Sequence, residues 1–213
     1  MTKTIVDVMT CSPVIPVIVI KQPDHALPLA RALVAGGLKV LEVTLRTAYG
    51  LDAIRAIAND LPNAIVGAGT VTEVEQVDAV IEAGGQFLVS PGSTQKLIEA
   101  ALQKEITLLP GVATPSEAMV LLEYGVQHMK FFPAEAAGGI PMLKSIHGPL
   151  PQITFCPTGG ITSETAKDYL ALPNVACVGG SWMVPQQLID AGDWGAIEAL
   201  AAETAALSPN TGS

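Results

Sequence analysis

Lys130 has surroundings that suggest covalent chemistry. Residues 128–135 read HMKFFPAE, so a single ammonium is flanked by apolar and aromatic residues at the end of a predicted β-strand. Loss of hydration there favours the neutral amine, which can attack a carbonyl carbon and form a Schiff base. The alternative is that Lys130 extends its ammonium into solvent. Lys21 is a rival amine, but the adjacent residues 22–24 (QPD) indicate a solvated loop and helix start, where Lys21 would help hold an anion.

Glu42 is the second residue with chemical potential, because it interrupts an apolar strand. Its carboxylate either shares protons with Lys130 as a general acid and base, or forms a structural salt bridge with Arg46. Arg46 offers a fork of donors that fits a substrate carboxylate, and Thr70 adds a hydroxyl from the next strand. A 2-oxo acid would use both groups. The simpler alternative is that Arg46 only balances the local acid.

Two glycine pairs follow the last two predicted strands. Gly159 and Gly160 come after Thr158, and Gly179 and Gly180 precede Ser181. Glycines let backbone N–H groups approach an anion, and a following helix N-terminus adds a positive dipole end. Each pair alone is also typical of a tight turn. Their position in the last two units favours a phosphate site.

These residues need elements that bring them together. Short apolar runs rich in Val and Ile alternate with amphipathic segments of helical length, which predicts parallel strands joined by crossover helices. The predicted strands are residues 14–20, 40–44, 64–67, 87–90, 107–110, 128–131, 152–156 and 175–178. The predicted helices are residues 26–35, 51–59, 74–83, 95–103, 115–122, 142–146, 164–170 and 194–206.

Eight such units favour a closed (β/α)₈ barrel over an open doubly wound sheet. No G-x-G-x-x-G follows the first strand, which also disfavours a dinucleotide-binding sheet. We expect one domain over residues 1–213, with an extra N-terminal helix within residues 1–12, centred on 2–9, that plugs the barrel, and a frayed tail at 208–213. Active sites of barrels lie at the carboxyl ends of the strands, where all the residues above are predicted.

Composition excludes several classes of function. A net charge of −9 and a pI near 4.7 argue against a nucleic-acid binder, so any phosphate must be held locally. Cys11, Cys156 and Cys177 are far apart and match neither a disulfide framework nor a zinc site, and the three histidines lack metal-ligand spacing. We expect reduced, mostly packed thiols, no metal, no membrane segment and no signal peptide, hence a cytoplasmic protein.

Several motifs together resemble one known family. Residues 42–47 (EVTLRT), 67–71 (GAGTV), 130–135 (KFFPAE), 157–161 (PTGGI) and 179–182 (GGSW) are similar, in order, to the 2-keto-3-deoxy-6-phosphogluconate (KDPG) aldolase family, also called the 4-hydroxy-2-oxoglutarate aldolase family. The resemblance extends from about residue 13 to 194. It implies a class I (β/α)₈ lyase without metal or cofactor, assembled as a homotrimer. The implied reaction is reversible cleavage of KDPG to pyruvate and glyceraldehyde 3-phosphate, with 4-hydroxy-2-oxoglutarate as a further substrate.

The resemblance also implies roles for individual residues. Lys130 matches the Schiff-base lysine and Glu42 the general acid and base, while Arg46 and Thr70 match the groups around the pyruvate carboxylate. Pro91 and Phe132 would contact the pyruvyl methyl group. The phosphate end of the substrate and its neighbouring hydroxyls would bind Thr158, Gly159, Gly160, Gly179, Gly180 and Ser181.

Two other classes remain open from the residues alone. A phosphate-binding barrel isomerase or epimerase would share the glycine pairs but has no use for a lysine in an apolar strand. A catalytically inactive oligomeric barrel would keep the fold, although packing does not require Glu42, Arg46 and Lys130 at one rim.

Overall fold

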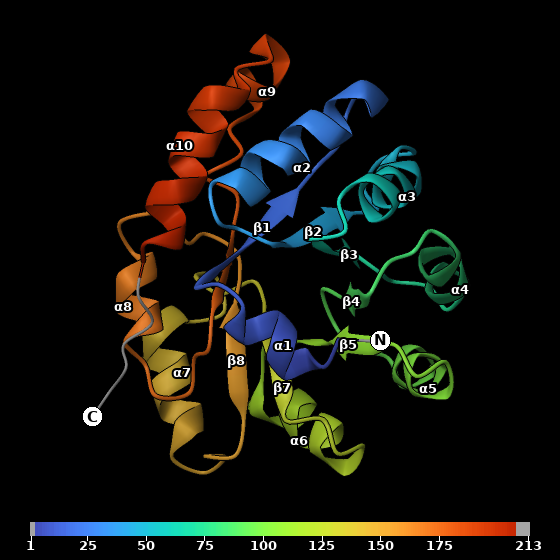
Figure 1. Ribbon diagram of the computed structural model, residues 1–213. Helices are drawn as coiled ribbons and strands as arrows, with labels where there is room; N and C mark the ends of the chain where they lie inside the picture. The colour runs from blue at the N-terminus through green and yellow to red at the C-terminus, as the bar shows by residue number, and fades with distance from the viewer. Residues whose placement is uncertain (1–2, 208–213) are drawn as a thin grey trace.

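The structure, a computed structural model that describes residues 3–207, is a curled sheet of parallel strands surrounded by helices (Figure 1). Every strand pairs with its neighbours in parallel. The strands are β1 (Val14–Ile18), β2 (Val40–Thr44), β3 (Ile65–Gly69), β4 (Phe87–Val89), β5 (Thr107–Leu109), β6 (Gly111–Val112), β7 (His128–Phe131), β8 (Thr154–Pro157) and β9 (Val178–Gly180).

The strand order closes the sheet into a barrel. One sheet has the order β5-β4-β3-β2-β1-β9 and the other β6-β7-β8. Only Pro110, which has no N–H to donate, separates β5 from β6, and its carbonyl accepts the Lys130 N–H at 2.8 Å. Bridges between Phe155 and Val175 and between Thr158 and Gly179 join β8 to the β9 side. Counting β5 and β6 as one interrupted strand, the barrel has eight positions, which confirms the predicted fold.

Helices cover the outside of the barrel (Figure 1). They are α2 (Ala26–Ala35), α3 (Gly50–Asp60), α4 (Glu75–Glu82), α5 (Gln95–Gln103), α6 (Pro115–Glu123), α7 (Gly139–His147), α8 (Ala166–Leu170), α9 (Gln186–Ala191) and α10 (Trp194–Ala205), with a 3-10 turn at Pro23–His25. Local sequence sets their starts. In α6, for example, the Thr114 hydroxyl accepts the Glu117 N–H, the Glu117 carboxylate accepts the Thr114 N–H, and Pro115 occupies the first turn.

An additional helix, α1 (Ile5–Thr10), lies at the end of the barrel where the strands begin. Its Val8 and Met9 are fully buried in the cluster that fills the barrel, which also contains Ile15 and Phe87. The Thr107 hydroxyl donates to the Lys3 carbonyl at 2.5 Å and fixes the segment before α1 to β5. The predicted N-terminal helix is therefore confirmed. It begins after the capping residue Thr4, and the part predicted at residue 2 lies outside the described residues, as does the tail at 208–213.

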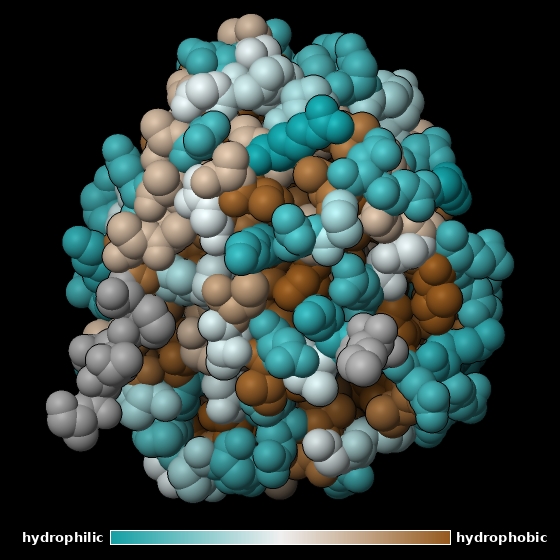
Figure 2. All heavy atoms as spheres, in the orientation of Figure 1, coloured by the Kyte–Doolittle hydropathy of each residue, from teal (hydrophilic) through white to brown (hydrophobic). Residues whose placement is uncertain are grey.

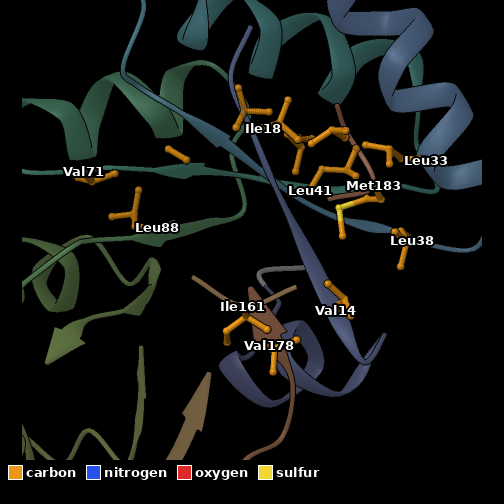
Figure 3. Close-up of a cluster of buried hydrophobic side chains, with 14 of the residues drawn as sticks. Val14, Ile18, Leu33, Leu38, Leu41, Val71, Leu88, Ile161, Val178 and Met183 are labelled. Atoms are coloured by element: carbon orange, nitrogen blue, oxygen red, sulfur yellow. The ribbon is translucent and has the colours of Figure 1, made fainter. Parts of the chain in front are cut away.

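The larger apolar core lies between the strands and the helices. Figure 3 shows side chains of this core from β1 and β2 (Val14, Ile18 and Leu41) together with Leu33 of α2 and the nearby Leu38. All five side chains are buried to 99% or more. Removing a side chain of this size from water contributes about 1.5–3 kcal/mol to folding, so this layer holds the helices against the strands.

The surface is mixed in character. Figure 2 shows polar residues spread over the face seen in Figure 1, with hydrophobic side chains visible between them. Among residues 3–207, no helix combines the length and apolar character needed to cross a bilayer.

Some predicted boundaries were wrong. The last strand spans Val178–Gly180 rather than 175–178, so its two glycines pair with β1 instead of forming a loop. Helix α7 starts earlier than predicted, at Gly139, and α8 starts later, at Ala166. Helix α9 was missed, although Pro185 before it and Gly192 after it are ordinary start and stop signals.

Candidate active site

Lys130 and Glu42 form a buried pair inside the barrel. Lys130 on β7 donates from Nζ to Glu42 Oε1 on β2 at 3.3 Å, and each residue is only 3% exposed. The prediction that the lysine is buried is confirmed, and the solvent-exposed alternative is wrong. Nζ also lies 5.1 Å from the centroid of the Phe132 ring, which limits the access of water to one side of the amine. Charges this far from water are costly unless paired, so the two groups hold each other in place.

The strand register explains why these side chains meet. Lys130 pairs with Gly111 on one side and Cys156 on the other, while Glu42 pairs with Val17 and Gly67. Space for the carboxylate depends on Gly69, because a Cβ atom there would collide with Glu42 Oε1. Gly69 was not singled out from the sequence, although a glycine at a strand end commonly marks a close approach.

Arg46 does not pair with Glu42. Its Nε donates instead to the Thr70 hydroxyl at 3.0 Å, so the structure overturns the predicted alternative of a Glu42–Arg46 salt bridge. Thr70 has a φ angle of 59°, a conformation that β-branched residues rarely adopt. Such strain is typical of functional sites, where the surroundings impose the conformation. Arg46 is exposed, so the rest of its guanidinium remains available to an anion.

A pocket of about 230 Å³ opens beside this group. Its lining brings together eight of the predicted site residues: Arg46, Phe132, Thr158, Gly159, Gly160, Gly179, Gly180 and Ser181. Of the described residues that line it, Arg46 is the only basic one. Phe132 connects the pocket to Lys130, so the pocket and the buried pair form one site at the carboxyl ends of the strands.

Val17 and Ile161 also line the pocket and were not predicted. The sequence could have indicated both as site residues, since Val17 lies near the end of the first strand and Ile161 directly follows a glycine pair. Pro91 does not line the pocket, but its backbone lies close to Gly111, the strand partner of Lys130. The predicted contact of Pro91 with a substrate methyl group therefore stays a prediction.

The two glycine pairs have different structures. Gly159 and Gly160 form a loop after β8 with φ angles of 105° and 81°, which glycine adopts without strain. Within residues 3–207, the N–H groups of Gly160 and Ile161 donate to no other residue, so two consecutive donors are free for an anion. This loop therefore has the features of the predicted cradle.

Gly179 and Gly180 belong to β9 and serve close packing instead. A Cβ atom at Gly179 would collide with the Thr158 hydroxyl, and one at Gly180 with the Trp182 ring. No helix begins directly after either pair, because α8 begins at Ala166 and α9 at Gln186. A phosphate bound here would therefore depend on backbone N–H groups rather than on a helix dipole.

The remaining candidate groups do not line the pocket. Lys21 is exposed in the turn before Pro23–His25, as the sequence predicted. Cys156 and Cys177 are buried, and the neighbouring Cys156 thiol together with burial holds the pKa of Cys177 well above its ordinary value. Cys11, in contrast, is exposed. In the described part of the chain, no cluster of His, Cys, Asp or Glu is suited to a metal ion.

A larger cavity of about 410 Å³ lies at the opposite end of the barrel, between α1 and α5. Its lining is mostly aliphatic, with residues such as Ile98, Leu102 and Leu108. His128 is the only imidazole in this lining, and burial lowers its pKa. No nucleophile paired with an acid or base faces this cavity among the residues described, so we place the chemistry at the smaller pocket.

A closed parallel barrel with a buried lysine against a carboxylate at the carboxyl ends of its strands has the architecture of a lysine-dependent lyase. Comparisons with known proteins agree with this class. Residues 5–200 match the family model described as KDPG and KHG aldolase. The KHG/KDPG aldolase of Escherichia coli K12 is 55% identical over 196 residues, which cover 92% of this chain and 92% of that protein.

Solved structures agree as well. A KDPG aldolase from Legionella pneumophila, with pyruvate captured as a covalent carbinolamine, is 53% identical, with a TM-score of 0.92 and coverage of 93% of this chain and 97% of that one. The Zymomonas mobilis ZM4 enzyme with 3-phosphoglycerate is 46% identical, with a TM-score of 0.94 and full coverage of both chains. The chain belongs to the KDPG and KHG aldolase family, as its motifs predicted.

Proposed function

We propose that this chain is a class I aldolase that reversibly cleaves KDPG to pyruvate and glyceraldehyde 3-phosphate, and 4-hydroxy-2-oxoglutarate to pyruvate and glyoxylate. The observation that carries the proposal is the buried Lys130–Glu42 pair, 3.3 Å apart, beside a pocket with free backbone donors. The Escherichia coli relative, which is 55% identical, is named KHG/KDPG aldolase, and a Legionella relative was captured with pyruvate bound covalently.

The first half of the mechanism follows from the pair. Glu42 accepts a proton from the Lys130 ammonium, and the neutral amine attacks the C2 carbonyl of the substrate. Glu42 then donates a proton to the carbinolamine oxygen, which leaves as water and gives a protonated imine. The short path between Nζ and Oε1 allows these transfers without a separate base.

The second half uses the imine as an electron sink. Glu42, directly or through a water, takes the proton of the C4 hydroxyl as the C3–C4 bond breaks, and the aldehyde leaves. The bonding electrons pass into the imine, which becomes an enamine. Protonation of the enamine carbon and hydrolysis then release pyruvate and restore Lys130.

The other site residues bind the two ends of the substrate in this proposal. Arg46, held by Thr70, binds the carboxylate, and Pro91 and Phe132 contact the methyl end. Thr158, Gly159, Gly160 and Ser181 bind the phosphate, supported by Gly179 and Gly180. No cofactor or metal takes part. We also propose, as the family resemblance implies, that the chain is a single domain that assembles as a homotrimer in the cytoplasm.

Reductive trapping tests the proposal. The protein is incubated with pyruvate and sodium borohydride, and the adduct is located by peptide mass spectrometry. We expect a stable pyruvyl adduct on the peptide that carries Lys130, and no adduct in a Lys130→Ala control with an unchanged circular dichroism spectrum. A wild-type protein without an adduct on any lysine would contradict the mechanism and favour a phosphate isomerase or an inactive barrel.

A further inference from the structure

A tyrosine–glutamate pair lies behind the loop of Gly159 and Gly160 and outside the pocket. Tyr169 of α8 is fully buried, and its hydroxyl donates to Glu135 Oε1 at 2.5 Å. Burial and the hydrogen bond to Glu135 raise the pKa of Tyr169, so the hydroxyl remains a protonated donor over the pH range in which enzymes of this kind work. Neither residue lines the pocket, and the mechanism above uses neither of them.

Glu135 is in direct contact with the loop. It lies in the segment after β7, where its own N–H donates to the Gly159 carbonyl at 3.1 Å and the Ala134 N–H donates to the Thr158 carbonyl at 2.8 Å. Its side chain packs so closely on Gly160 that a Cβ atom there would lie 2.7 Å from Glu135 Cγ. Glu135, which does not line the pocket, thus supports the loop through these contacts.

The pair also joins the two ends of the loop. β8 holds one end in the sheet, and α8, which carries Tyr169, follows the other end after the turn in which Thr162 N–H donates to the Thr165 hydroxyl. The hydrogen bond between Tyr169 and Glu135 therefore ties α8 to the segment that carries the loop's backbone contacts.

We infer that Glu135 and Tyr169 are positioning residues that hold the loop of Gly159 and Gly160 in the shape that binds the phosphate end of the substrate. The inference rests on the proposed function, which places the phosphate at this loop. The Glu135–Tyr169 pair would then favour phosphorylated over unphosphorylated substrates, because the reacting Lys130–Glu42 pair is held separately by β7 and β2. Loosening the loop should weaken binding of the phosphorylated substrate and leave the unphosphorylated one unchanged.

Tyr169→Phe removes the hydroxyl and keeps the ring in its buried site. We expect 3-phosphoglycerate, measured by titration calorimetry, to bind about tenfold more weakly, which corresponds to the loss of one hydrogen bond to a charged group. KM for KDPG should rise by a similar factor at nearly constant kcat, while kcat/KM for 4-hydroxy-2-oxoglutarate should change less than about twofold. Glu135→Gln keeps an acceptor oxygen for the Tyr169 hydroxyl, so this variant should retain most of the wild-type affinity.

The chain offers a matched control. The Tyr124 hydroxyl donates to Glu99 Oε1 at 3.4 Å, far from the pocket, so Tyr124→Phe removes a similar pair without touching the loop. If Tyr169→Phe fails to fold, Glu135→Ala breaks the same contact from its exposed side and should give the same loss for 3-phosphoglycerate.

Two results would overturn the inference. One is unchanged affinity for 3-phosphoglycerate in both Tyr169→Phe and Glu135→Ala. The other is an equal loss on both substrates together with a lower melting temperature, which would mean a purely structural role. Reductive trapping with pyruvate keeps this test separate from that of the proposed function, because trapping reports on Lys130 whereas 3-phosphoglycerate binding reports on the loop.

Discussion

The reaction end of the site consists of side chains, whereas the phosphate end consists mainly of backbone groups. At the reaction end, Lys130 and Glu42 are long side chains on opposite sides of a closed barrel, both 3% exposed and paired with each other. At the phosphate end, the free donors are backbone N–H groups of a loop, and the side chains that shape it lie behind it. The chemistry therefore depends on which side chains are present, whereas phosphate binding depends on backbone shape. Substitutions should separate the two properties.

The largest effect in this comparison is expected for Glu42→Gln. The amide keeps the size and one acceptor oxygen for Lys130 but cannot take or return a proton. We expect kcat for KDPG cleavage to fall by about 10²–10⁴, the usual contribution of a general acid and base. Trapping of pyruvate by borohydride should still occur at Lys130, but more slowly.

Binding of 3-phosphoglycerate to Glu42→Gln serves as the internal control and should be unchanged. Wild-type kcat in this variant would show that the carboxylate only neutralises the lysine. Proton transfer would then have to be reassigned to another group in the pocket.

A smaller effect on the same end is expected for Gly69→Ala. The new Cβ atom would collide with Glu42 Oε1, so the carboxylate must move away from its present place beside Lys130. Displacements of about 1 Å in an active site can cost about 10²-fold in rate. We therefore expect kcat to fall by up to about that factor, with 3-phosphoglycerate affinity unaffected.

Gly92→Ala is the matched control for Gly69→Ala. Gly92 follows the next strand, and a Cβ atom there would meet nothing within 4 Å. Its kinetics should equal those of the wild type. Similar losses in the two variants would show that the close approach at Gly69 is irrelevant to Glu42.

Sequence reasoning succeeded where side chains and strand order decide the result. Strict alternation of strands and helices predicted the barrel, and the residues at strand ends predicted that Lys130, Glu42, Arg46 and Thr70 lie at one end of it. The structure pairs Lys130 with Glu42 and Arg46 with Thr70. Sequence reasoning failed where backbone geometry decides. Both glycine pairs looked alike as sequence, yet Gly159 and Gly160 form a left-handed loop, and Gly179 and Gly180 lie in β9 because Thr158 and Trp182 pack against them.

The partner of Glu42 was undetermined for a similar reason. Arg46 is four residues from Glu42 in the sequence and Lys130 is 88 residues from it. The sequence alone could not show which of the two is the partner, and Arg46, the nearer one, is not. Only the closure of the barrel brings β7 opposite β2. The Tyr169–Glu135 pair shows the same dependence on tertiary structure, since its members lie on different elements, 34 residues apart.

The smallest effect is expected for Gly160→Ala, at the phosphate end. The φ angle of 81° strains any residue with a Cβ, and this Cβ would also press on Glu135. Non-glycine residues in such a conformation cost about 1–3 kcal/mol, part of which the loop can relieve by shifting. We expect 3-phosphoglycerate to bind about tenfold more weakly, while the yield of pyruvate trapped at Lys130 stays at the wild-type level.

Gly125→Ala separates the effect of backbone strain at a positive φ angle from the effect of the new Cβ atom on Glu135. Gly125 has a comparable φ angle of 75°, but a Cβ atom there would meet nothing within 4 Å, and the position lies outside the pocket. Both alanine variants should therefore lose stability, as thermal unfolding would record, and only Gly160→Ala should lose affinity for 3-phosphoglycerate. A loss of affinity in both, or in neither, would contradict the division of the site into a reaction end made by side chains and a phosphate end made by the backbone.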